Sequence, residues 1–114
     1  MVIDDLTRIS HMLEEAQVAI SFCNDMTFEE FCNDRKTVNA TVRSIEIIGE
    51  AASKISKPFR EEHNIIDWRD VISMRNVLAH AYFEIDYEIV WNTVQGDLPP
   101  LIITLNAILN KEKK

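Results

Sequence analysis

Residues 37–55 read TVNATVRSIEIIGEAASKI, and this stretch indicates the fold class of the whole chain. Its apolar residues recur at three- and four-residue intervals, the spacing of one face of an α-helix. They are Val38, Val42, Ile45, Ile48, Ala52 and Ile55. The pattern predicts a long helix that begins near Asp34 and ends at Pro58, because proline cannot continue a helix.

The sequence on either side of this stretch also predicts helices. Apolar spacing predicts a first helix over residues 4–22, and Thr27 with Glu30 forms a capping-box pattern that opens a short turn. Asp67 is a candidate N-cap for a helix over residues 68–81, and Asp86 for one that runs through residue 94 and closes at Gly96. No strand-like alternation competes with these patterns. We expect an all-α fold, an antiparallel bundle of four main helices whose last helix is broken or kinked at Pro99-Pro100.

Length and composition indicate one compact domain over residues 1–114. Apolar residues make up 46% and charged residues 27%, with two Gly and three Pro, which is typical of a folded helical protein. No window approaches the roughly 18 apolar residues of a membrane span, and residues 1–8 lack the order of a signal peptide. We therefore expect a cytoplasmic protein, in which Cys23 and Cys32 are reduced core thiols rather than ligands of a zinc cage.

The formal net charge of −7 is distributed unevenly. Residues 35–60 carry six cations against Glu46 and Glu50, whereas residues 1–34 and 61–97 are acidic. The basic block has two interpretations, pairing with acidic neighbouring helices or a surface that follows phosphates. The sequence leaves both open.

Two polar stripes interrupt the apolar pattern. On one straight helix, four residues fall within about 60° of one another: Arg69, Ser73, Asn76 and His80. The long helix carries a second stripe at helical spacing, formed by Asn39, Arg43, Glu46 and Glu50. The two stripes could face each other or line a groove.

Arg75 and His80 cannot share one face of a straight helix, because five residues rotate the chain by about 140°. Either the helix ends or deforms near His80, or two chains meet across a two-fold axis and each His80 approaches the other chain's Arg75. We favour the dimer. A purely structural interpretation is also open, in which Arg75 pairs with Glu46 or Glu50, His80 ends a helix and Tyr82 is a core aromatic.

The remaining candidates are weaker. His11 lies on an exposed helix face and His63 follows two glutamates in a connector, so we expect both to be solvated. Trp68 and Trp91 have the spacing of core residues rather than of base-stacking platforms. We expect no metal site, because no carboxylate or His cluster has ligand spacing.

The segment Arg75-Asn76-Val77-Leu78-Ala79-His80-Ala81-Tyr82 resembles the active-site motif of the HEPN superfamily of ribonucleases. Residues 47–52, IIGEAA, and the stretches 67–76 and 86–91 are similar to the minimal HepT-like branch. The resemblance implies an all-helical homodimer that cleaves RNA, such as tRNA or mRNA, without a metal or cofactor. It also implies the toxin half of a toxin–antitoxin pair of type VII-like organisation.

The resemblance assigns roles to particular residues. His80 would be the acid–base group, Arg75 would stabilise the charged phosphate and Asn76 would orient the imidazole or hold a phosphate oxygen. Supporting or RNA-contacting positions would be Arg43, Glu46, Glu50, Arg69 and Ser73. Tyr82 would receive AMP from a partner antitoxin, a minimal nucleotidyltransferase of the MNT type. Two alternatives remain, a non-catalytic helical adaptor or nucleotide-binding partner of a nucleotidyltransferase, and a plain oligomerising bundle.

Overall fold

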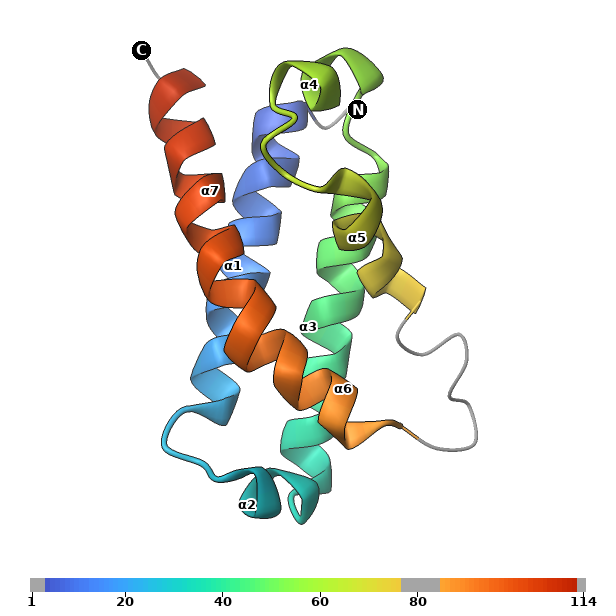
Figure 1. Ribbon diagram of the computed structural model, residues 1–114, viewed down its shortest axis with the longest axis vertical. Coiled ribbons are helices and arrows are strands. Elements are labelled where there is room, and N and C mark those ends of the chain that lie inside the picture. Colours follow the sequence, from blue (N-terminus) through green and yellow to red (C-terminus); the bar gives the residue numbers. More distant parts are fainter. Residues whose placement is uncertain (1–3, 77–84, 113–114) are drawn as a thin grey trace.

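A computed structural model describes residues 4–76 and 85–112, and within those ranges the regular elements are all helical, as predicted (Figure 1). The α-helices are α1 (Asp5–Cys23), α2 (Phe28–Cys32), α3 (Arg35–Ser53), α4 (Lys57–Glu62), α5 (Trp68–Ser73), α6 (Tyr87–Asn92) and α7 (Leu98–Glu112). Two irregular helical segments complete them, the 3₁₀ turn η1 (Met74–Asn76) and the π-helical turn η2 (Thr93–Asp97). Along these two ranges no helix combines the length and the apolar character needed to cross a membrane.

Side-chain caps fix where the helices begin. The Asp4 carboxylate accepts from the Thr7 amide at 2.8 Å, and Thr27 and Glu30 form the predicted capping box. Ser56 caps α4, and aspartates cap the starts of three further helices, at Asp34, Asp67 and Asp86. Each cap satisfies an amide that has no partner within the helix. The predicted starts at Asp4, Thr27, Asp67 and Asp86 are therefore confirmed.

The core lies between the three long helices. Helix α1 packs against both α3 and α7 and contributes Ile9 and Met12, which are fully buried. Ile45 and Ile48 of α3 and Leu105 of α7 are also fully buried. Figure 1 shows α1 and α3 running along the long axis of the molecule, with α4 near the start of α1 and α2 at the opposite end. All six apolar residues predicted from the periodicity of residues 37–55 are buried.

The end of α3 differs from the prediction. The helix ends at Ser53 rather than at Pro58, and Pro58 lies in the first turn of α4, where a missing amide proton costs nothing. Ser56 in the short link donates to the Asp5 carboxylate from its amide at 2.9 Å and its hydroxyl at 2.7 Å. These bonds join the start of α4 to the start of α1.

The predicted break in the last helix also lies elsewhere. Gly96 does not close a helix, because it sits inside η2, which leads directly from α6 into α7. Pro99 and Pro100 fall in the first turn of α7, where they are tolerated. The irregularity is the π turn before them, a form that inserts an extra residue into a helix.

Candidate active site

Helix α5 holds the candidate site against the body of the molecule. Trp68 and Val71 are buried, and the Trp68 indole Nε1 donates to the His63 carbonyl oxygen at 3.0 Å. Asp67 caps the helix through the Asp70 amide at 3.2 Å. The first turn of α5 is therefore fixed by both packing and hydrogen bonds.

The α-helix does not continue to residue 81 as predicted. It ends at Ser73 and tightens into η1, which holds Arg75 and Asn76 on the surface. A 3₁₀ turn has three residues per turn, so the rotation expected for a straight α-helix no longer applies beyond Ser73. The helix changes form before Arg75 rather than near His80, which lies outside the described residues, so both the deformed helix and the dimer stay predictions.

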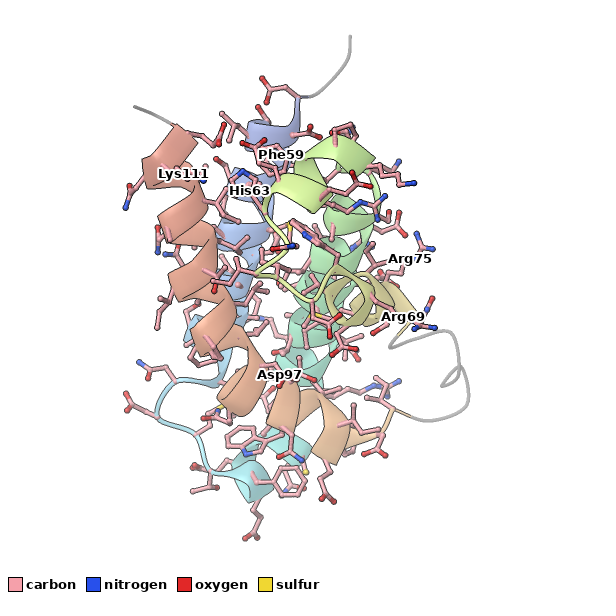
Figure 2. All side chains as sticks on the ribbon, turned by 45° about the horizontal axis from the view of Figure 1, so that its top comes forward. Phe59, His63, Arg69, Arg75, Asp97 and Lys111 are labelled. Carbon is pink, nitrogen blue, oxygen red and sulfur yellow. The ribbon has the colours of Figure 1, made fainter. Side chains whose placement is uncertain are left out.

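Arg75 reaches its position because Gly49 has no side chain. A Cβ atom built on Gly49 of α3 would lie 2.2 Å from the Arg75 amide nitrogen and 2.9 Å from its Cα. Both distances are far below any van der Waals contact, so only glycine permits this approach of η1 to α3. The backbone of Arg75 is consequently seated on α3 while its side chain extends toward solvent, on the same side of the molecule as Arg69 (Figure 2).

Next to η1 lies a cavity of about 1110 Å³ that we call the acidic hollow. It is lined by four aspartates together with polar and apolar groups. The aspartates are Asp67, Asp70, Asp86 and Asp97. The other lining residues are Ser73, Asn76, Tyr87, Thr93, Val71, Met74, Ile85, Ile89, Pro100 and Leu101. The charge of Asp67 raises the pKa of the Asp70 carboxyl above its ordinary value, with a smaller contribution from Asp97. Such a lining favours cationic or neutral polar groups over a phosphate.

The second predicted stripe lines a different groove, between α1 and α3. Arg43 and Glu50 lie in this 500 Å³ groove together with Arg8, His11 and Lys54. Arg43 is also paired with Glu46, one turn along α3. Ser73 and Asn76 therefore line the acidic hollow while Arg43 and Glu50 line the α1–α3 groove, and the two stripes do not form one cleft.

The remaining site predictions have mixed outcomes. His80 and Tyr82 lie outside the described residues, so their roles stay predictions. Arg69 is exposed on α5, and the Ser73 hydroxyl donates to the Asp70 carbonyl oxygen at 2.6 Å. His11 is exposed, as expected, and neither Cys23 nor Cys32 is in a disulfide.

The prediction for His63 is wrong, because its side chain is only 4% exposed. Its Nε2 atom lies 3.2 Å from an Oε2 of Glu112, and Glu62 completes a cluster whose ligand-type atoms all lie within 4.8 Å of one another. The expectation of no metal site stays a prediction, but nothing in the sequence indicated this group of side chains. Sequence spacing missed it since Glu112 comes from the far end of α7.

Comparison with known proteins decides the family. The chain matches the family described as ribonuclease HepT-like over residues 12–108. It belongs to the HepT-like ribonuclease family. The match confirms the resemblance seen in the sequence and covers every described candidate residue from Arg43 to Asn76.

Two individual relatives align with this chain over most of their own length. A protein of Thermococcus cleftensis named as a probable ribonuclease HepT is 38% identical over 99 residues, which cover 87% of this chain and 84% of that protein. A provisionally named RNase of Caldanaerobacter subterraneus subsp. tengcongensis is 39% identical over 105 residues, 92% of this chain and 94% of its own. No solved structure matches this chain.

The contact of η1 with α3 and the cluster around His63 differ in how far the HepT-like match covers them. Gly49, Arg75 and Asn76 lie within the matched range, whereas Glu112 lies beyond its end. The seating of Arg75 on α3 is thus part of the HepT-like region, and the His63 cluster includes a residue outside it.

Proposed function

We propose that this HepT-like chain is a metal-independent endoribonuclease and the toxin of a type VII-like toxin–antitoxin pair. The observation that carries the proposal is the family match over residues 12–108, which includes the Arg75-to-Tyr82 motif. The exposed position of Arg75 supports it, because a guanidinium that is free of burial can bind a phosphate bidentately. The substrate would be RNA, such as tRNA or mRNA.

The proposed chemistry is acid–base catalysis of an internal phosphoryl transfer. His80 removes the proton of a ribose 2′-hydroxyl, whose oxygen attacks the adjacent phosphorus, and the bond from phosphorus to the 5′-oxygen breaks. That leaving oxygen takes up a proton, and the products carry a 2′,3′-cyclic phosphate and a 5′-hydroxyl. Arg75 stabilises the negative charge on the phosphorane oxygens, and Asn76 orients the imidazole or a phosphate oxygen. The acid and base roles are shared by two chains if the protein acts as a homodimer.

Tyr82 has a regulatory role in this proposal. A partner nucleotidyltransferase of the MNT type transfers AMP to its hydroxyl, which adds bulk and a negative phosphate close to Arg75 in sequence. The added charge repels RNA and competes for the guanidinium. Modified protein is therefore inactive.

A second candidate function has a specific observation in its favour. Four carboxylates line the acidic hollow beside Asn76, and they oppose the binding of a polyanion. A non-catalytic adaptor would bind the nucleotidyltransferase or a nucleotide through the same motif. Because it binds no long RNA, the carboxylates would not repel its ligand as strongly. It would form the complex without cleaving anything.

Cleavage of purified tRNA and mRNA by the isolated protein in excess EDTA tests the proposal. We expect cleavage that leaves cyclic phosphate ends, and a loss of roughly 10²- to 10⁴-fold in His80→Ala. Asn106→Ala changes an exposed residue of α7 and serves as the control with unchanged cleavage. Equal cleavage by wild type and His80→Ala overturns the mechanism, and inactivity of unmodified wild-type protein favours the adaptor.

A further inference from the structure

The cluster of Glu62, His63 and Glu112 lies where α4 meets the end of α7, away from Arg75 (Figure 2). The two glutamates are reached from solvent, since Glu62 is exposed and the Glu112 side chain is 27% exposed. His63 is the opposite, because its side chain is almost completely buried. The arrangement is a surface opening with an imidazole at its base.

The His63 Nε2 atom is buried, and no group within residues 4–76 and 85–112 makes a hydrogen bond with it. The Glu112 carboxylate oxygen lies only 3.2 Å away, yet the two groups are not aligned for a hydrogen bond. A buried polar atom without a partner is unusual, since burial without a hydrogen bond is unfavourable. Something other than this carboxylate is needed to satisfy the imidazole.

A divalent transition metal fits this geometry better than a proton does. Zinc binds imidazole nitrogen and carboxylate oxygen at about 2.0–2.2 Å, so two ligands at the tetrahedral angle lie roughly 3.3 Å apart. The metal would then lie along the lone pair of His63 Nε2, and the Glu112 Oε2 atom would lie to one side of that direction. The distance of 3.2 Å from Nε2 to Oε2 matches that arrangement.

The charges in the cluster support the same occupant. Two carboxylates and a neutral imidazole sum to −2, which a divalent cation balances, whereas a protonated His63 balances only one carboxylate. Imidazole with carboxylate ligands is a donor set that suits zinc and its neighbours in the first transition row. The ligand-type atoms of the three residues all lie within 4.8 Å of one another.

The imidazole is also held in place by its surroundings. The Phe59 ring packs on the His63 ring with a centroid distance of 4.5 Å, and the His63 carbonyl oxygen accepts from the Trp68 indole at 3.0 Å. A ligand that is fixed before the metal arrives loses less entropy on binding.

We propose that Glu62, His63 and Glu112 bind one Zn²⁺-class ion that fastens the end of α7 to α4, with the fourth position open to water. The role is structural, because the ion would join segments that are 49 residues apart in the sequence. The site is separate from the proposed ribonuclease centre. RNA cleavage in EDTA and metal binding are therefore independent tests.

Titration of the EDTA-stripped 114-residue chain with ZnCl₂ tests the proposal by isothermal calorimetry. We expect one saturable ion per chain, and a rise in the Tm of unfolding with zinc concentration, since a ligand that binds only the folded state stabilises it. Co²⁺ in place of Zn²⁺ should give the visible absorption of a nitrogen- and oxygen-ligated ion. No saturable binding overturns the site and leaves an ion pair between His63 and Glu112.

Matched variants locate the bound ion. Glu112→Gln and His63→Gln should each weaken zinc binding by at least about tenfold. Mutation of residues that only hydrogen-bond to metal ligands already lowers metal affinity by about this factor, so loss of a ligand should cost at least as much. Glu61→Gln removes an exposed carboxylate next to the cluster and should leave the affinity unchanged, as should the double change His11→Gln with His80→Gln. Glu112 sits in the last turn of α7, so its variant keeps the test valid if His63→Gln does not fold. Affinity that survives Glu112→Gln overturns the proposal.

Discussion

Helix α3 contacts its neighbours in two different ways. In the core it places side chains such as Ile45 and Ile48 among those of α1 and α7, where they are fully buried. At η1 it presents Gly49, and the absence of a side chain lets the backbone of Arg75 come close. The first contact depends on filled volume and the second on empty space. Deleting atoms should therefore damage the scaffold, whereas adding one should damage the candidate site.

Ile45→Ala tests the scaffold and should have the largest effect on stability. Removal of a fully buried isoleucine leaves a cavity and should cost about 2–5 kcal/mol in the free energy of unfolding, measured by urea denaturation. At a temperature where the variant remains folded, RNA cleavage per molecule should change little. A cleavage loss as large as that of His80→Ala in folded Ile45→Ala would show that scaffold and site are not separable in this way.

Gly49→Ala tests the second contact. The added methyl group would meet the Arg75 amide nitrogen at 2.2 Å, so η1 must move, at a cost of about 1–3 kcal/mol in stability. Cleavage should fall on the order of 100-fold, because a displacement of about 1 Å is enough to misplace a catalytic group. The expected signature is a modest change in the free energy of unfolding with a large change in kcat.

Gly96→Ala is the matched control for that variant. Among the residues that the structure describes, a Cβ at Gly96 meets no atom within 4 Å, and the φ of Gly96 is not positive. Alanine there should leave cleavage unchanged and stabilise the protein by up to about 1 kcal/mol, since glycine is a poor helix former. Similar losses in both variants would mean that the close approach of Arg75 is not what Gly49 provides.

Asp70→Asn should have the smallest effect, and it extends the comparison to the acidic hollow. Asp67 raises the pKa of Asp70, so the folded state holds its proton more tightly than the unfolded state does. Stability then falls as the pH rises from the ordinary carboxyl pKa through the raised one. The variant should have a slightly higher Tm than wild type at pH 7, with the difference vanishing in acid.

Asp34→Asn should show the opposite dependence on pH. The Thr37 amide lowers the pKa of the Asp34 carboxyl, so its contribution is present above the ordinary carboxyl pKa and lost as the pH falls through the lowered one. The variant should have a slightly lower Tm than wild type at pH 7, and the two should converge in acid. The Tm of both variants is measured by circular dichroism from about pH 2 to 8, because this range brackets the carboxyl pKa values. The same sign for both would contradict the two causes given.

Features set by neighbouring residues were predicted from the sequence. The caps at Thr27 and Asp86 involve an amide only three residues away, so the local pattern contains all the information they need. The end of α3 was not predicted, because Pro58 is compatible with either ending one helix or beginning another. The Ser56 bonds to Asp5, 51 residues away, contribute to this link and do not show in a local pattern.

The candidate site depends more on contacts between distant residues. Gly49 gave a signal, since a glycine inside a helical pattern often marks close packing, but nothing in the sequence indicates that Arg75 is what it contacts. The sequence contains no signal for the His63 cluster, because a His after two glutamates in a connector is typical of a solvated surface. Only the tertiary fold brings Glu112, in the last turn of α7, to within 3.2 Å of His63.

The aspartate caps change what the net charge of −7 means for an approaching polyanion. Asp4, Asp34, Asp67 and Asp86 each sit at the N-terminus of a helix, an end that carries roughly half of a positive elementary charge. At these four places a carboxylate faces a partial charge of opposite sign, so the field that reaches solvent is weaker than a count of residues implies. A count of acidic residues thus overstates how strongly this surface repels a nucleic acid.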